Sequence, residues 1–341
     1  MHTRRVIQPD TIFLLALPGL LLLDVLNSLF RSAPPQGMSF FVVFGLMLVG
    51  FAAPSWWAEQ VKRPQPFLSR NVARIPFWVM LAMLALYGMP VGRSLAGTHP
   101  NAVGVAAIIG VVACALAARK LPIPELILGL GLCLLVEARG SFVMISIFAM
   151  VWMGISFLSG TAGHRRESKR FGVLATALIA LFAIFVLVLV DFLVPLIMDS
   201  FQLRDPVRGI GSGFTGRTEL WDAPLAIAFA YPFSGSIGWY RGIVASGHNG
   251  FISLLSQFGV VPGSLIIAFI LWRTIRAIVM AVRYPKDDIG RIVASFLVAL
   301  LAFSIVEYVP LNITSPYAIM TSMLLLYPVG KIARLEGSPP H

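Results

Sequence analysis

Residues 100–118 read PNAVGVAAIIGVVACALAA, and residues 121–138 read LPIPELILGLGLCLLVEA. Each run is almost wholly apolar and close to the roughly 20 residues that a helix needs to cross a bilayer. Arg119 and Lys120 stand between the two runs, and Pro122 is unsuited to the interior of a continuing helix. This stretch predicts two membrane-spanning helices joined as a short hairpin.

The same apolar pattern recurs along the whole chain. Of its residues 58% are hydrophobic and 12% are charged, with a mean hydropathy of +0.86. This composition excludes an ordinary cytosolic enzyme, a disordered chain and a nucleic-acid-binding domain. We therefore predict an all-α polytopic membrane protein, a single integral membrane domain over residues 1–341 with about ten transmembrane helices. The expected spans are residues 12–30, 38–55, 75–92, 100–118, 121–138, 140–159, 172–190, 248–272, 292–309 and 314–330.

The basic residues predict the orientation. With ten spans and an inner N-terminus, 19 of the 26 Lys and Arg residues fall on the inner side. This excess is typical of cytoplasmic loops, so both termini are expected in the cytoplasm. All seven outer cations are arginines. Arginine grips phosphate in a bidentate way, although a general preference for arginine (21 Arg against 5 Lys) explains the observation equally well.

One outer segment, residues 191–247, is a long loop between the seventh and eighth spans. Long ordered loops in compact proteins usually carry function. Thr215 is a credible N-cap for a short helix, and Arg217 and Trp221 would then share one face. The alternative is a surface helix whose arginine pairs with Glu219. The loop also contains the outer arginines Arg204, Arg208 and Arg241.

Two histidines, His99 and His248, fall on the outer side. His248 opens an expected span, where it could accept a proton near neutral pH beside free N–H groups that favour an anion. A plain capping or interfacial role is the alternative. Arg139 stands at the outer end of the sixth span, and its alternative roles are an interfacial cation or an ion pair with Glu137.

Signatures of other chemistries are few. The sequence has no His-Glu-x-x-His, no Walker A motif and no Gly-x-Ser-x-Gly. The outer acids form no cluster suited to a divalent metal, and Cys114 and Cys133 lie inside apolar runs as ordinary core residues. We therefore expect no metal and no cofactor. A proton-coupled transporter would place more charge within the membrane than Asp24 alone.

The motifs together resemble the signature region of the bacterial O-antigen ligase and O-antigen polymerase family. The similarity covers roughly residues 95–275 and departs from the family at Ala138, where a small hydroxyl residue is usual, and at Gly235-Ser236-Ile237-Gly238, where Gly-x-Gly is common. Ligases of the family also often have twelve spans. The matching pieces are GTHPN at 97–101, ARGS at 138–141, TGRTELW at 215–221, YPFSG at 231–235, HNGF at 248–251 and LLSQFG at 254–259.

This resemblance implies a GT-C-like, metal-independent glycosyltransferase of the bacterial inner membrane, with its site facing the periplasm. We further expect direct inversion at the sugar, without a covalent intermediate on the enzyme. The implied donor is a glycan on undecaprenyl pyrophosphate, and the implied acceptor is a hydroxyl of lipid A core. Arg139 and Arg217 would neutralise the pyrophosphate as the anomeric bond breaks, and His248 would be the general base. The expected substrate contacts are Trp221, Asn249, Arg241, His99 and Asn101.

Other functions remain consistent with the sequence. A polymerase would pass the glycan to another lipid-linked repeat of O-antigen, capsule or exopolysaccharide, and a further variant would glycosylate a protein. A lipid-linked glycan transporter would be expected to show symmetric halves, which the sequence lacks. A subunit of a polysaccharide export complex would not need His248 together with outer arginines.

Overall fold

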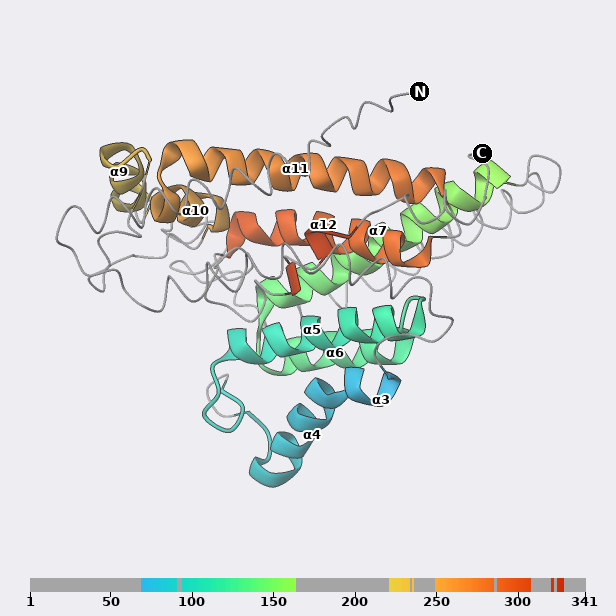
Figure 1. The fold of residues 1–341 in the computed structure, drawn as a ribbon. Coiled ribbons are helices and arrows are strands. Elements are labelled where there is room, and N and C mark those ends of the chain that lie inside the picture. Colours follow the sequence, from blue (N-terminus) through green and yellow to red (C-terminus); the bar gives the residue numbers. More distant parts are fainter. Residues whose placement is uncertain are drawn as a thin grey trace, which may run out of the picture. The chain divides into compact units, whose positions relative to one another are not determined.

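The computed structural model describes residues 69–90, 94–163, 221–233, 235, 249–284, 287–307, 320–321 and 324–327 (Figure 1). Within these residues every regular element is a helix, and the β-pairing is limited to an isolated bridge between Leu95 and Thr98. Four helices are long and apolar enough to cross a membrane: Pro100–Ala118, Arg139–Leu158, Val260–Arg283 and Asp288–Ile305. The protein is therefore a helical membrane protein, as the sequence predicts.

The chain divides into two compact units. The described part of the first unit is residues 221–233, 235, 249–274, 304–307, 320–321 and 324–327. The described part of the second unit is residues 69–90, 94–163, 275–284 and 287–303. The expectation of one domain over the whole chain stays a prediction.

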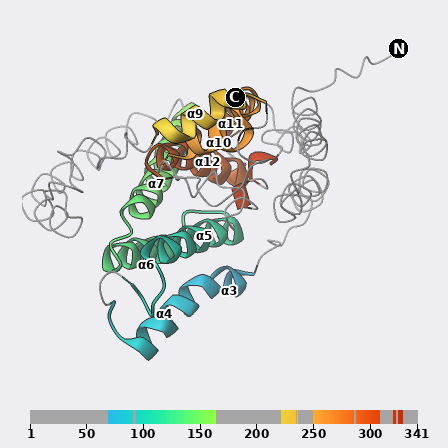
Figure 2. The same cartoon turned by 90° about the vertical axis from the view of Figure 1, so that its left-hand side faces the viewer.

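In the second unit, helix α5 (Pro100–Ala118) packs against four other helices (Figure 2). These are α3 (Arg70–Ala73), α4 (Ile75–Tyr87), α6 (Ile123–Leu135) and α7 (Arg139–Gly163). Small residues allow this close packing, as in many membrane helices. A Cβ atom on Gly110 would lie 2.7 Å from the ring of Phe77, and one on Gly129 would lie 3.0 Å from Val111. Ala107, Ile108 and Cys114 complete this buried core.

The predicted helical hairpin between residues 100–118 and 121–138 is confirmed, but α6 has 13 residues and is not among the four helices long enough to cross a membrane. Helix α5 ends at Ala118, and its C-cap Arg119 adopts the left-handed conformation with φ 52°. Helix α6 then begins at Ile123 with Pro124 in its first turn, where the missing N–H is tolerated. The expected span at residues 75–92 is shorter in the structure, because α4 ends at Tyr87 and its C-cap, Gly88, has a φ of 78°.

The expected single span over residues 248–272 is wrong. The structure has α10 (Gly250–Phe258), a break at Gly259, and then α11 (Val260–Arg283). Gly259 has a φ of 85°, which a helix cannot contain, and Pro262 lies in the first turn of α11. Helix α11 also continues well beyond residue 272, and α12 (Asp288–Val306) begins before the expected residue 292.

Arg273 lies in the middle of α11, where the sequence predicts the start of a cytoplasmic loop. Its side chain is buried, and its Nε and Nη2 atoms donate to the carbonyl oxygens of Leu325 and Tyr327 at 2.6 and 2.5 Å. The guanidinium also lies 6.0 Å from the ring of Trp272. These backbone acceptors explain how a charged residue is accommodated inside a membrane helix.

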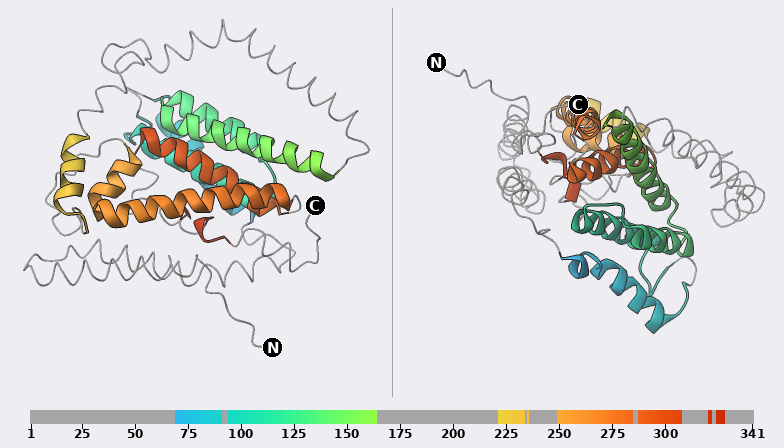
Figure 3. Two further views of the ribbon diagram at one scale, coloured as in Figure 1. Left: turned by 90° about the horizontal axis from the view of Figure 1, so that it is seen from above. Right: turned by 90° about the vertical axis from the view of Figure 1, so that its right-hand side faces the viewer.

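A short helix, α9 (Asp222–Ala230), lies in the segment predicted to be a long periplasmic loop. It packs against α10 (Figure 3). This agrees with the expectation that the loop contains short helices. The expected spans at residues 12–30, 38–55 and 172–190 lie outside the described residues, so the number of ten spans and the GT-C-like fold stay predictions.

Candidate functional site

The described candidate residues fall into two groups. His99, Asn101 and Arg139 belong to the second unit, and Trp221 and Asn249 belong to the first. The other candidates lie outside the described residues: Arg204, Arg208, Arg217, Arg241 and His248.

His99 is the N-cap of α5. Its Nδ1 atom accepts a hydrogen bond from the backbone N–H of Asn101 at 3.2 Å, and Pro100 occupies the first helical position. A neutral His99 with this bond carries its proton on Nε2. A tight turn leads into the cap, in which Leu95 and Thr98 exchange two backbone hydrogen bonds of 3.2 and 2.8 Å. The side chain of His99 is exposed, so capping leaves its outer edge open to solvent.

Arg139 is the first residue of α7, directly after a helix end of defined geometry. The N–H of Ala138 donates to the Cys133 carbonyl oxygen at 2.8 Å, and that of Glu137 donates to Leu134 at 3.1 Å. These are the two bonds of a Schellman motif, whose left-handed position is usually glycine. Here it is Glu137, with a φ of 53°. The backbone before Arg139 is therefore held in a left-handed conformation that is energetically unfavourable for residues other than glycine.

Helix α5, which begins within the first upstream motif (residues 97–101), contacts the second (residues 138–141) at Gly104. A Cβ atom on Gly104 would lie 2.6 Å from the Cβ atom of Ser141 and 3.0 Å from that of Ala138. Gly104 stands one turn after Pro100, so the start of α5 is packed directly on the start of α7. This places His99 and Arg139 at the same end of the second unit.

In the first unit, Trp221 is the N-cap of α9 and Asp222 lies in its first turn. Asp222 has the position that the helix dipole favours for an acid. Residues 215–220 lie outside the described residues. The shared helical face of Arg217 and Trp221, and the helix start at Thr215, therefore stay predictions.

The turn at residues 231–235 is in backbone contact with the break between α10 and α11. The N–H of Val261 donates to the Pro232 carbonyl oxygen at 2.9 Å. A Cβ atom on Gly259 would lie 2.5 Å from the carbonyl oxygens of both Tyr231 and Pro232. Gly235 also has a positive φ, 56°, and a Cβ atom there would lie 2.5 Å from the carbonyl oxygen of Gln257. Glycine is required at both positions, by conformation and by space.

Asn249 caps α10 and ties it to the end of α12. Its Oδ1 atom accepts from the N–H groups of Phe251 and Ile252 at 2.9 and 3.1 Å. Its Nδ2 atom donates to the carbonyl oxygen of Ile305 at 3.1 Å. Asn249 is 8% exposed, and the chain directly after His248 is thus fixed by three hydrogen bonds. A contact between Asn249 and substrate stays a prediction.

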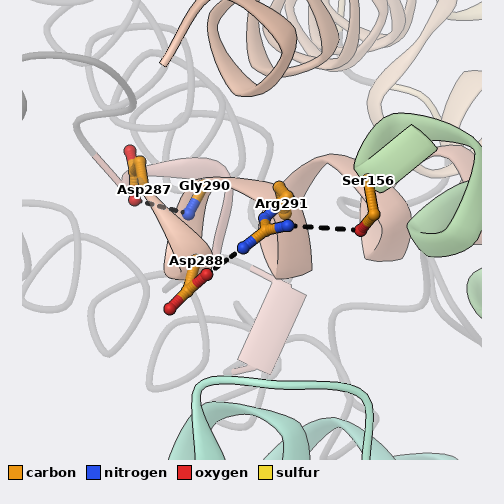
Figure 4. Close-up of polar contacts among 5 residues, drawn as sticks. All are labelled: Ser156, Asp287, Asp288, Gly290 and Arg291. Carbon is orange, nitrogen blue, oxygen red and sulfur yellow. Dashed lines mark hydrogen bonds and ion pairs between the residues drawn. The ribbon is translucent and has the colours of Figure 1, made fainter. Parts of the chain in front are cut away.

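A polar cluster that the sequence analysis missed joins α7 to α12 within the second unit (Figure 4). Arg291 pairs with Asp288, donates to Ser156 Oγ at 3.3 Å and lies 5.2 Å from the ring of Trp152. Asp287 caps the helix by accepting from the Gly290 N–H at 2.7 Å. The acidic pair at residues 287–288 followed by Arg291 was the available signal. The cluster anchors a helix start, and no candidate catalytic residue belongs to it.

Among the described residues, no group of three or more His, Cys, Asp or Glu side chains could hold a metal ion. The expectation of a metal-independent site stays a prediction, because most of the candidate residues lie elsewhere in the chain. No protein-family model matches the sequence, and no curated protein matches it either.

Proposed function

We propose that the protein is an inner-membrane glycosyltransferase of the O-antigen ligase type. It transfers a glycan from undecaprenyl pyrophosphate to an acceptor hydroxyl at the periplasmic face, without a metal and with inversion. The observation that supports this most is the pairing of motif pieces that are distant in sequence. Gly104, three residues after the 97–101 motif, contacts Ala138 and Ser141, and residues 231–235 contact the break that follows 254–258.

The chemistry assigned to these residues follows from the leaving group. The acceptor oxygen attacks the anomeric carbon as the bond from that carbon to the pyrophosphate breaks, and His248 takes the hydroxyl proton. The growing charge on the pyrophosphate is neutralised by Arg139 and Arg217, whose guanidinium groups suit phosphate oxygens. A positioned general base contributes roughly 10²–10⁴-fold in rate. The Schellman turn before Arg139 and the Asn249 cap after His248 restrict the backbone beside two of these three groups.

Complementation of a deletion strain tests the assignment. The gene is deleted and restored as wild type, His248→Ala or Arg217→Ala, and the undecaprenyl-linked glycans are extracted and analysed by gel and mass. We expect both variants to accumulate donor and to leave the acceptor bare at equal protein level. His164→Ala, in a predicted cytoplasmic loop, is the matched control and should behave as wild type.

The form of the accumulated donor identifies the acceptor. Long polymer on the lipid carrier indicates a ligase, whereas single repeats indicate a polymerase. Glycan that stays on the cytoplasmic leaflet in the deletion strain would contradict a transferase and indicate a transporter. A His248→Ala strain with the wild-type glycan profile would show that the general-base assignment is wrong.

A further inference from the structure

Basic side chains gather in the second unit at the end where α5 turns into α6. Arg74 binds Glu125 with both Nε and Nη2, at 2.7 and 2.6 Å from Oε1. Arg70 lies one helical turn before Arg74, and the backbone N–H of Arg74 donates to the carbonyl oxygen of Arg70. Helix α3, which begins at Arg70, packs on α5. Arg119 and Lys120 form the hairpin turn itself. Four basic residues thus lie in α3, directly after α3 and in the α5–α6 turn, and Glu125 is the acidic partner of Arg74.

Much of this charge faces outward. Arg70 and Lys120 are exposed, and the Arg74 side chain remains 34% exposed although it binds Glu125. Glu125 itself is 5% exposed, so the carboxylate belongs to the protein interior and does not neutralise the outer surface. Exposed guanidinium and ammonium groups in this arrangement favour an anion with phosphate chemistry.

An apolar surface adjoins the basic cluster, and it is formed by α4 and α6, which contact each other. On α4, Ile75, Trp78 and Val79 share one face, and Trp78 is 61% exposed. On α6, Ile123 and Ile127 are one turn apart, and Ile127 is 64% exposed. An anionic head with apolar chains fits these neighbouring surfaces, whereas a free phosphate ion would use the cluster alone.

The cluster is distant from the candidate site of the same unit. His99 and Arg119 stand at opposite ends of α5, which has 19 residues. Such a helix is about 28 Å long, close to the thickness of the hydrocarbon core. A lipid here would therefore lie in the leaflet opposite to His99 and Arg139, which is the cytoplasmic leaflet in the predicted orientation.

We propose that this cluster binds an anionic phospholipid of that leaflet. Arg70, Arg74, Arg119 and Lys120 bind the phosphate, and the acyl chains lie on the exposed faces of α4 and α6. Basic clusters at the cytoplasmic ends of membrane helices recognise anionic head groups in this way. The inference does not depend on the proposed glycan transfer.

Native mass spectrometry of the purified full chain tests the proposal, with phosphatidylglycerol and phosphatidylcholine as probes. The test variant is Arg70→Gln/Arg119→Gln/Lys120→Gln, which keeps the Arg74–Glu125 pair. The matched variant, Arg165→Gln/Arg166→Gln/Lys169→Gln, removes the same charge from a predicted cytoplasmic loop. We expect phosphatidylglycerol to bind the wild type and the matched variant with equal affinity. Its affinity for the test variant should be lower by about tenfold or more.

Two competition experiments distinguish a phospholipid from other phosphate-containing ligands. Inorganic phosphate should not displace phosphatidylglycerol, and undecaprenyl phosphate should not bind in preference to it. Displacement, such a preference, equal binding of phosphatidylcholine, or undiminished binding to the test variant would each overturn the proposal. The melting temperature of the lipid-free test variant checks its folding, and Lys120→Gln, at an exposed position, gives a milder test in which a smaller loss is expected.

Discussion

The two units hold their motif residues in different ways. In the second unit, the start of α5 and the start of α7 meet through side chains, with Gly104 against Ala138 and Ser141. In the first unit, the turn at 231–235 meets the α10–α11 break through backbone atoms, including the 2.9 Å bond from Val261 to Pro232. The contact in the second unit is thus made between two long helices, and that in the first unit between a turn and a break in a helix.

This difference follows from the behaviour of the backbone near a membrane. A continuous helix satisfies its own N–H and C=O groups, so its neighbours need only fit in shape. A broken helix exposes backbone groups, and each must find another partner. In the first unit those partners are Asn249, Arg273 and the carbonyl of Pro232. Substitutions should therefore be most damaging where backbone meets backbone.

The largest expected effect is that of Gly259→Ala. A methyl group would meet two carbonyl oxygens at 2.5 Å, at a φ of 85°. We expect the free energy of unfolding to fall by about 3–4 kcal/mol. Thermal unfolding of the purified protein, followed by circular dichroism, measures the loss. Gly131→Ala is the control, because a methyl group there has no other atom within 4 Å. Equal melting temperatures for the two variants would contradict the comparison.

A smaller effect is expected for Gly104→Ala in the second unit. The added methyl group must displace the Ser141 side chain, which should lower the free energy of unfolding by about 1–3 kcal/mol. Ser141→Gly in the same chain removes that obstacle and should restore part of the loss. A double-mutant cycle on melting temperatures measures the coupling. Strictly additive effects would show that the two positions do not compete for space.

The smallest expected effects separate the two tasks of Asn249. Asn249→Ala removes both the cap and the bond to Ile305, and should lower the free energy of unfolding by about 1–2 kcal/mol. Asn249→Ser keeps a capping oxygen and removes only the donor to Ile305, so its loss should be smaller. Thermal unfolding ranks the two variants. If serine were as damaging as alanine, the bond to Ile305 would be the dominant contribution.

The sequence predicts the second unit better than the first. Residues 100–118 and Pro122 are enough to predict the α5–α6 hairpin, because length, hydropathy and a helix breaker all agree. The α10–α11 break was missed because hydropathy continues through it. Gly259 followed by Pro262 was a local stop signal of the kind that ends helices. The burial of Arg273 could not be predicted, since its carbonyl partners are more than 50 residues away in sequence.

The candidate site shows the same division. A capping role for His99 is a local property, since its partner is two residues away. The contact of the start of α5 with residues 138–141 is made at one small residue, Gly104, and a sequence pattern does not specify which helices meet there. The roles of Arg217 and His248 rest on the motif resemblance and stay predictions.

Arg273 also bears on how the chain is made. Its acceptors at Leu325 and Tyr327 are synthesised 52 and 54 residues after it. At a translation rate of about 5–20 residues per second, these acceptors are synthesised roughly 3–10 s after Arg273. An arginine at the centre of a membrane helix makes the apparent free energy of insertion less favourable by about 2.5–3.5 kcal/mol. The two hydrogen bonds from Arg273 can therefore form only after Leu325 and Tyr327 have been synthesised, well after α11 itself.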